Sequence, residues 1–262
     1  MRESLVVAVA QPPCVGHDVA ANARAHAAAM RAPEAAGARV VVFPELSLTG
    51  YELDADPVDP GDERLQPIVR ACADTGAVAL AGAPVAGAAV AGTPVAGTPV
   101  AGTLSPDNSK KRGVFIAVLA IDGQGATVAY RKMWLGEEEA GRFTPGPGPA
   151  KITVDGWRLG LAVCKDTGVA RHAADTAALG VDAYLAGTVK GAGEAELQHD
   201  RARRIATGHR LWVAVASFAG PTGGGYAETA GRSGIWAPDG TLVAETGPQA
   251  PAVGVATFKI MV

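Results

Sequence analysis

The chain has 262 residues, of which 48% are hydrophobic and 19% charged, and its formal net charge is −3. This composition allows a sizeable buried core, and the lack of a basic surplus argues against a nucleic-acid or acidic-membrane partner. Three cysteines without a CxxC or Cys/His ligand spacing favour free thiols, no metal site and a reduced, cytoplasmic compartment.

The first part of the chain alternates expected strands and helices. A short apolar run follows Glu3 and is typical of a first strand rather than a signal peptide, and no run approaches the roughly 20 residues of a membrane span. Asp18 can cap the first helix. The expected order is strand 5–10, helix 19–31, strand 38–43, helix 62–76 and strand 77–81. Buried, non-alternating strands between helices indicate an α/β protein.

Residues 80–103 interrupt this alternation with a repeat of five residues. Its apolar members are Leu80, Val85, Val90, Val95 and Val100. A period of five matches neither a helix nor a strand, and the prolines at 84, 94 and 99 disfavour a regular ladder. We expect a low-complexity loop insertion over about 83–106. A β-solenoid-like module is the alternative, but so few turns would bury little core.

The rest of the chain returns to regular elements, and Asp122-Gly123 is a hairpin signal between two of them. The expected order is strands 114–121, 126–130, 152–154 and 158–163, helix 169–179, strand 181–185, helix 194–209, and strands 211–216, 233–237, 242–245 and 253–260. No linker divides this order, so we expect one domain over residues 1–262 that carries the insertion.

Cys164 stands where the apolar strand 158–163 ends and a polar turn begins. A thiol at a strand end, facing free backbone N–H groups, can be a nucleophile with an oxyanion site beside it. A buried core cysteine is the alternative, because free cysteine is among the most buried residue types.

Two charged residues occupy similar positions. Glu45 follows a buried strand and a proline, where a carboxylate is costly unless it has a partner or a task. Lys132 follows the strand 126–130. Glu45 accepting hydrogen bonds from its own turn and Lys132 on the surface are the ordinary explanations. Together with Cys164, however, they place three reactive groups at strand ends, and strand ends of one polarity gather into one crevice.

Several segments resemble the motifs of the nitrilase, or carbon–nitrogen hydrolase, superfamily. They are 41–51 (VVFPELSLTGY), 130–132 (YRK) with 143–146 (FTPG), 160–166 (GLAVCKD), 231–235 (GRSGI) and 238–240 (PDG). The resemblance covers nearly the whole chain, with the motifs in the family's order. It implies a four-layer α-β-β-α sandwich, a single carbon–nitrogen hydrolase domain and a homodimer or higher homo-oligomer.

The resemblance also implies roles for these residues. Cys164 would be the nucleophile, Glu45 the general base and Lys132 the cation that stabilises the oxyanion. A thiol with a pKa near ~8.5 needs such a base and cation to become a thiolate at neutral pH. The Lys165 backbone N–H would join Lys132 at the oxyanion. Glu139 would position Lys132 and help to bind the substrate nitrogen.

Three features leave alternatives open. Glu139 belongs to the acidic run 137–139, so a solvated carboxylate is the other interpretation. Lys165 stands where many family members have an aromatic residue, and Trp134 where many have histidine. Both positions lie near the expected pocket, so they bear on the identity of the substrate.

The expected reaction is hydrolysis of a non-peptide C–N bond in a small linear amide or carbamoyl substrate, through a cysteine thioester and without a metal or organic cofactor. Ammonia or an amine would be released. One alternative is acyl transfer to an acceptor other than water. Another is a catalytically silent binding or regulatory relative, against which the intact Glu45, Lys132 and Cys164 set argues.

Other features carry less chemistry. The stretch 220–225 has P-loop spacing but is not followed by the Lys-Ser pair that phosphate binding needs. His172 follows Cys164 on an expected helix, where we expect a surface or partly packed residue rather than a Cys–His pair. Cys14 and Cys72 are interpreted as buried or incidental thiols.

Overall fold

The computed structural model describes residues 4–32, 35–88 and 112–260. Its α-helices are α1 (Val19–Arg31), α2 (Gln66–Thr75), α3 (Ala170–Ala178) and α4 (Ala195–His209). Its strands are β1 (Leu5–Gln11), β2 (Val40–Val42), β3 (Val78–Ala88), β4 (Arg112–Asp122), β5 (Gly125–Arg131), β6 (Ala150–Val154), β7 (Trp157–Val163), β8 (Ala183–Thr188), β9 (Trp212–Ser217), β10 (Gly234–Trp236), β11 (Leu242–Glu245) and β12 (Ala252–Phe258).

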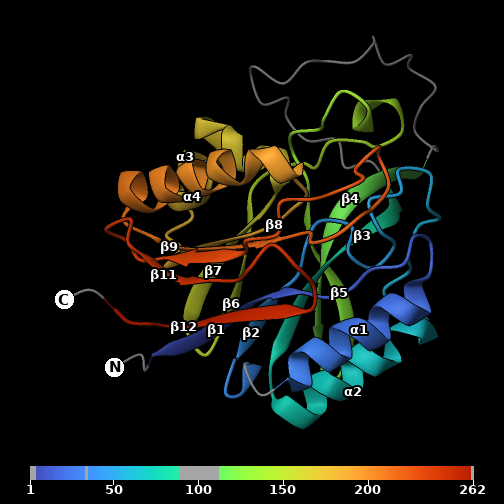
Figure 1. Ribbon diagram of the computed structural model, residues 1–262, viewed down its shortest axis with the longest axis horizontal. Helices are drawn as coiled ribbons and strands as arrows, with labels where there is room; N and C mark the ends of the chain where they lie inside the picture. Colours follow the sequence, from blue (N-terminus) through green and yellow to red (C-terminus); the bar gives the residue numbers. More distant parts are fainter. Residues whose placement is uncertain (1–3, 33–34, 89–111, 261–262) are drawn as a thin grey trace.

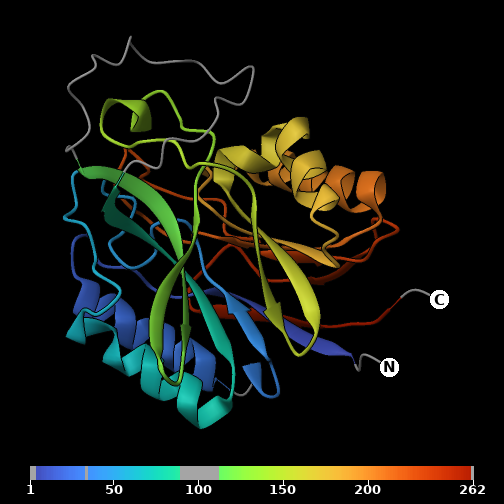
Figure 2. The ribbon, with the colours of Figure 1, turned by 180° about the vertical axis from the view of Figure 1, so that it is seen from behind.

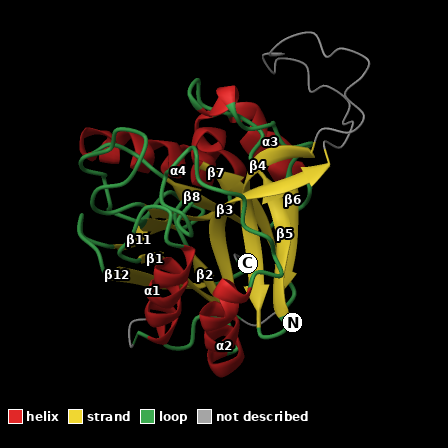
Figure 3. Ribbon diagram, turned by 90° about the vertical axis from the view of Figure 1, so that its right-hand side faces the viewer, coloured by secondary structure: helices red, strands yellow, loops and turns green. Residues whose placement is uncertain are grey.

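These strands pair into two six-stranded sheets, in the orders β12-β1-β2-β3-β4-β5 and β11-β10-β9-β8-β7-β6. Helices α1 and α2 cover the outer face of the first sheet, and α3 and α4 cover that of the second (Figure 1 and Figure 3). The inner faces of the two sheets pack against each other. This four-layer α-β-β-α sandwich confirms the expected fold class.

Strand β1 shows how one strand serves two cores. Leu5, Val7 and Val9 pack between the sheets, whereas Ala8 and Ala10 face the layer of α1 and α2. Successive side chains of a strand point to opposite faces, and both faces of this strand are covered. The strand is therefore apolar from Leu5 to Ala10 instead of alternating.

Local capping groups set the ends of the outer helices. The Asp18 carboxylate accepts a hydrogen bond from the Ala21 N–H at 2.8 Å, at the start of α1. Helix α2 ends at Gly76, which has a φ of 72° and donates its N–H to the Cys72 carbonyl at 2.8 Å. This left-handed ending favours glycine. None of the helices in the described ranges is long and apolar enough to cross a bilayer.

Strand β3 is longer than expected from the sequence. It pairs antiparallel with β4 as far as Ala88, with Pro84 opposite Ile116, so residues 83–88 lie in a strand and not in the expected loop. Proline fits here because β2 pairs with β3 only along Val78–Leu80, and the missing N–H therefore removes no bond to β2. The rest of the expected insertion, 89–106, lies outside the described residues.

The outer edges of the two sheets lie side by side. The β4–β5 hairpin ends the first sheet and the β6–β7 hairpin ends the second, and Figure 2 shows the two hairpins next to each other. The connection over 132–149 therefore passes from one sheet to the other. It contains Lys132 and the segment 143–146.

The chain after β2 runs between the two sheets and needs glycine on each side. A β-carbon at Gly82 of β3 would clash with the backbone nitrogen of Leu46, and one at Gly187 of β8 would lie 2.5 Å from the Phe43 carbonyl oxygen. Because neither position has a side chain, this segment can carry Glu45 into the space between the sheets.

Candidate active site

Cys164 lies at a sharp turn between β7 and a short 3₁₀ helix, η4 (Cys164–Gly168). Its φ is 41°, a conformation that costs an L-residue about 1–3 kcal/mol and persists only where the surroundings hold it. The side chain is buried, and the thiol donates a hydrogen bond to the Val189 carbonyl at 3.3 Å. The turn thus presents the thiol at the end of β8.

Asp166 connects the turn at Cys164 to residues on either side of Lys132. Its Oδ2 accepts hydrogen bonds from the Val163 N–H at 2.9 Å and the Tyr130 hydroxyl at 2.7 Å. Its Oδ1 accepts one from the Trp134 N–H at 2.9 Å. The carboxylate therefore links the cysteine turn to residues on both sides of Lys132. Asp166 belongs to the segment 160–166, but its position in the sequence did not indicate this role.

Lys132, Glu45 and Glu139 meet in the interior. The Lys132 ammonium donates to Glu45 Oε1 at 2.6 Å and to the two oxygens of Glu139 at 2.7 and 2.8 Å. All three residues are at most 2% exposed. Glu139 is therefore a partner of Lys132, and the alternative of a solvated acidic side chain is wrong.

Two further groups fix the Glu139 carboxylate. The Tyr51 hydroxyl donates to Oε1 at 2.6 Å, and the Gly136 N–H donates to Oε2 at 2.5 Å. Burial acts to raise the pKa of Glu139, but the Lys132 ammonium and these donors together hold it below its usual value. Glu139 is thus an anion that holds Lys132 in place.

Burial and neighbouring charges also set the protonation of the other groups. Burial raises the pKa of Glu45 to about 7, against the lowering effect of Lys132. Burial, with the Glu45 charge, raises the pKa of the Cys164 thiol to about 12. Burial opposes the charge of Lys132, but Glu45, Cys164 and Glu139 outweigh it and raise its pKa. The site therefore contains a neutral thiol, an ammonium and a carboxyl group that titrates near neutrality.

The arrangement leaves one acceptor open beside the thiol. Glu45 Oε2 is buried and has no hydrogen-bond partner among the described residues. The Cys164 thiol is close enough to influence the pKa of Glu45. A carboxylate oxygen without a partner is free to accept a proton.

The two positions that depart from the family pattern behave differently. The Lys165 side chain is exposed and donates to the Leu135 carbonyl at 2.6 Å, so its ammonium is not part of the buried cluster. The oxyanion role of its backbone N–H stays a prediction. Trp134 is partly buried, and its indole Nε1 has no acceptor among the described residues.

Tyr226 and its neighbours form one wall of the site, which the sequence did not indicate. Tyr226 packs edge-on against Tyr51, with ring centroids 5.6 Å apart, and Thr222 Oγ1 accepts the Tyr51 N–H at 2.9 Å. Burial raises the pKa of the Cys164 thiol, and Lys190 acts against that rise. Burial, and then the proximity of Cys164, raise the pKa of Tyr226. The glycine-rich stretch 220–225 is the signal that a tightly packed loop lies here, but the sequence led only to the rejection of a phosphate site at this stretch.

His172 is fully buried, so the expectation of a surface or partly packed residue is wrong. It is 0% exposed, because it lies on the buried face of α3 together with Ala173 and Thr176. Its ring nitrogens lie 2.9 Å from the hydroxyls of Tyr130 and Tyr184. Burial lowers its pKa, so it is a neutral member of the network behind Asp166.

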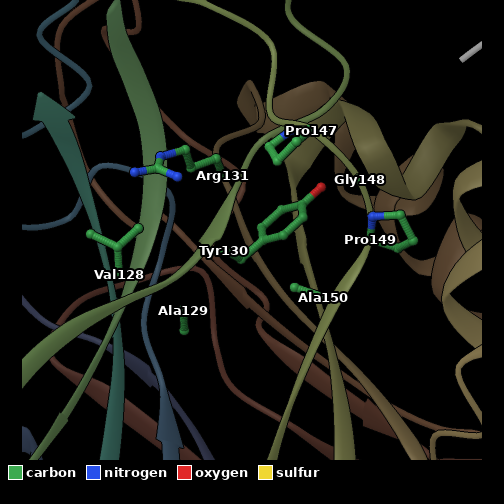
Figure 4. A pocket seen from close by; sticks show the side chains of 8 residues that line it. All are labelled: Val128, Ala129, Tyr130, Arg131, Pro147, Gly148, Pro149 and Ala150. Atoms are coloured by element: carbon green, nitrogen blue, oxygen red, sulfur yellow. The ribbon is translucent and has the colours of Figure 1, made fainter. Parts of the chain in front are cut away.

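A pocket and a group of possible metal ligands lie outside this cluster. A pocket of about 300 Å³ lies between β5 and the segment that leads into β6 (Figure 4), lined by Val128, Ala129, Tyr130, Arg131, Pro147, Gly148, Pro149 and Ala150. None of the residues Glu45, Lys132, Glu139 and Cys164 lines this pocket. His17, Glu52 and Asp54 have ligand atoms within 4.8 Å of one another, but exposed acidic groups are common without an ion, and we assign them no role.

Comparison with known proteins gives two matches in sequence. The family model described as Carbon-nitrogen hydrolase matches residues 6–260. A relative from Pseudomonas protegens, described as "Hydrolase in pqqF 5'region", is 29% identical over 272 residues, covering 99% of this chain and 85% of the relative.

Solved structures share the fold. A CN-hydrolase superfamily protein from Xanthomonas campestris, with an arsenic adduct in its active site, matches with a TM-score of 0.78 and 20% identity over 98% of this chain and 91% of its own. A double mutant of the amidase from Nesterenkonia sp. AN1, in complex with acrylamide, matches with a TM-score of 0.75 and 20% identity over 98% and 91%. At this identity the likeness concerns the fold alone.

Proposed function

This chain belongs to the carbon–nitrogen hydrolase family, and from that premise we propose that it hydrolyses the C–N bond of a small linear amide or carbamoyl compound through a thioester on Cys164. The observation that supports this most is the buried contact of Lys132 with Glu45 and Glu139 beside the thiol. A base and a cation next to a thiol are the groups that activate a nucleophile and stabilise an oxyanion.

In the first step, the Cys164 sulfur attacks the carbonyl carbon and its proton passes to Glu45 Oε2, the oxygen that has no other hydrogen-bond partner among the described residues. The carbonyl electrons move onto oxygen. The Lys132 ammonium stabilises that charge, and the Lys165 backbone N–H is the proposed second donor. Glu139 holds Lys132 in position and helps to bind the substrate nitrogen.

In the second step, the C=O bond reforms and the C–N bond breaks. The leaving nitrogen takes the proton from Glu45 and departs as ammonia or an amine. Water then attacks the thioester and gives a proton to Glu45, which returns it to the sulfur as the carboxylic acid leaves. Glu45 acts in turn as base and acid, for which a pKa of about 7 is well suited.

The choice of an amide draws on the structural comparison as well. The amidase from Nesterenkonia sp. AN1 was solved in complex with acrylamide. Its fold is shared by this chain, and a small uncharged amide group would fit a site whose catalytic cation is already paired with two carboxylates.

Product analysis tests this function and its closest alternative together. A panel of small amides is incubated with the protein, with and without hydroxylamine, and ammonia, carboxylate and hydroxamate are measured. Hydrolysis gives ammonia and carboxylate in equal amounts without hydroxylamine. Products that form only when an added acceptor is present would instead identify an acyltransferase. No product from any amide, with no labelling of Cys164 by an amide-like electrophile, would indicate a catalytically silent relative.

The cytoplasmic location and the homo-oligomeric state stay predictions. The described cysteines Cys14, Cys72 and Cys164 are free thiols, which suits a reducing compartment. Light scattering of the purified protein after size-exclusion chromatography measures the oligomeric state directly, and a monomer would contradict the expectation.

A further inference from the structure

Lys190 places a second cation beside the candidate nucleophile. It follows Val189, whose carbonyl accepts the hydrogen bond from the Cys164 thiol at 3.3 Å. The Lys190 side chain is only 13% exposed. Burial raises the pKa of the Cys164 thiol, and the Lys190 charge acts against that rise, as expected for a cation on the same side of the site.

This ammonium has no hydrogen-bond acceptor among the described residues. Its nearest carboxylate oxygen is Glu194 Oε1, at 3.6 Å. The other oxygen of Glu194 accepts the Gly191 N–H at 2.9 Å, so this carboxylate is held by its own turn. Glu194 is 42% exposed, and an ion pair of this kind contributes little. The ammonium can therefore form a shorter, charge-assisted hydrogen bond with a partner that arrives with the substrate.

The charges of the site favour an anionic partner at Lys190. Lys132 is already paired with Glu45 and Glu139, so it offers no surplus positive charge to a substrate. Tyr226 lies on the same side of the site, because its ring is 3.9 Å from where a β-carbon on Gly191 would be. Lys190 is therefore the cation that remains available beside an aromatic wall.

We propose that Lys190 binds a carboxylate of the substrate, so that the preferred amide carries an anionic group in addition to its amide. This rests on the proposed function, whose amide carbon must reach Cys164 while the anion reaches Lys190. A neutral amide leaves the ammonium without an acceptor, and a cationic amide is repelled by it.

Amides of matched size test the proposal by turnover. Succinamate, butyramide and 3-aminopropanamide differ in the group opposite the amide, which is anionic, neutral or cationic. We expect kcat/KM for succinamate to exceed that for butyramide by at least ~10-fold, as a charge-assisted hydrogen bond provides. In Lys190→Met the two values should agree within about 2-fold. Lys151→Met removes an exposed lysine on β6 and should keep the preference.

Alkylation of Cys164 tests the anchor without any turnover. Iodoacetate and iodoacetamide have nearly the same size and react with the same thiolate, so the ratio of their rates does not depend on the thiol pKa. We expect the rate with iodoacetate divided by the rate with iodoacetamide to fall at least ~5-fold in Lys190→Met and in Lys190→Gln. The same ratio should stay constant in Lys151→Met. Two substitutions of Lys190 are made so that a folding defect in one variant does not decide the result. Circular dichroism shows such a defect.

Turnover and alkylation together distinguish a failure of the anion site from a failure of the proposed hydrolysis. A ratio unchanged in both Lys190 variants would overturn the anion site even if amides are hydrolysed. Equal kcat/KM for succinamate and butyramide in the unmodified protein would overturn it as well. A ratio that falls while no amide is hydrolysed would support the anion site and reject the proposed hydrolysis.

Discussion

At the scale of single residues, Glu45 controls the pH dependence of the proposed reaction. Burial raises its pKa to about 7, above the usual range of a carboxyl group. The base must be ionised to accept the thiol proton, so the active fraction falls as the pH drops below about 7. We expect kcat/KM for a neutral amide to decrease about tenfold per pH unit on the acidic side. A constant value between about pH 5.5 and 8 would contradict this role.

A matched pair of variants supports that test. Glu45→Gln keeps the shape of the side chain but cannot take up a proton, so activity should be lost at every pH. Glu138→Gln changes an exposed carboxylate in the neighbouring acidic run and should leave the pH profile as it is.

Lys132 separates the need for a positive charge from the need for a compact donor. Its ammonium contacts both carboxylates in a space with almost no solvent access. Lys132→Arg keeps the charge but introduces a broad planar group that does not fit, so kcat should fall by at least ~100-fold, the effect of losing one oxyanion donor. A near-normal kcat for Lys132→Arg would reject the oxyanion role.

Lys132→Ala should reduce kcat at least as much as Lys132→Arg. It should also raise the pKa of the Cys164 thiol further, because the ammonium favours the thiolate. The pH dependence of Cys164 alkylation by iodoacetamide measures this shift. A thiol pKa that does not change in the variant would show that the ammonium is too far from the sulfur to act on it.

The sequence was informative for residues with a motif and not for those without one. Glu45, Lys132 and Cys164 follow strand ends within recognisable segments, and the structure brings Glu45 and Lys132 into contact, with Cys164 next to them. Lys190 and Tyr226 lie in connections whose proximity to Cys164 depends on the folded arrangement of both sheets. No local pattern in the sequence encodes that proximity.

At the scale of elements, the turn after β7 depends on one buried carboxylate. Asp166 accepts hydrogen bonds from Val163, Tyr130 and Trp134. Asp166→Asn would turn an amide N–H towards at least one of these donors, and should lower the free energy of unfolding by about 1–3 kcal/mol. It should also lower kcat by ~10- to 100-fold, because Cys164 and Lys132 are no longer held in register.

Denaturation in urea and steady-state kinetics measure the two effects. Asp175→Asn is the control, because the Asp175 carboxylate is partly exposed on α3 and pairs with the exposed Arg171 at 3.4 Å. Its stability and kcat should change little. Wild-type stability in Asp166→Asn would mean that the turn is held without this carboxylate.

Element positions were predicted better than element lengths and burial. The apolar run 158–163 matches β7 (Trp157–Val163) almost residue for residue. Strand β3 was predicted too short, because its second half contains glycine, alanine and Pro84, and only pairing with β4 supports it. His172 was misplaced for a related reason: one polar residue on a helix does not reveal which face the sheet covers.

At the scale of the whole molecule, the sequence pattern indicates an α/β protein but not the assignment of strands to two sheets. Strand β1 pairs with β12 from the other end of the chain, with Leu5 opposite Phe258. Such long-range pairing leaves no local trace, and the four-layer expectation came from the family resemblance. The extent of the single domain stays a prediction.

The repeat segment provides a test of the whole fold. Ala88 of β3 and Arg112 of β4 are paired, so a short turn can join them. Replacing residues 90–110 with a four-residue turn should change Tm by less than about 4 °C, because the five-residue repeat matches the period of neither a helix nor a strand and loop length contributes little to stability. A deletion that also removes 85–88 takes away part of the ladder and should lower Tm clearly. A fall of more than about 8 °C for the first replacement would reject the prediction.

The most direct test of the proposed chemistry is ammonia release from a small amide by the unmodified protein and by Cys164→Ala. Cys14→Ala serves as the control, because it removes another free thiol that lies outside the cluster of Glu45, Lys132 and Glu139. Release of ammonia by the unmodified protein and by Cys14→Ala, with none above background from a folded Cys164→Ala, is the predicted result. Ammonia release by Cys164→Ala at a rate comparable to that of the unmodified protein would contradict the cysteine thioester.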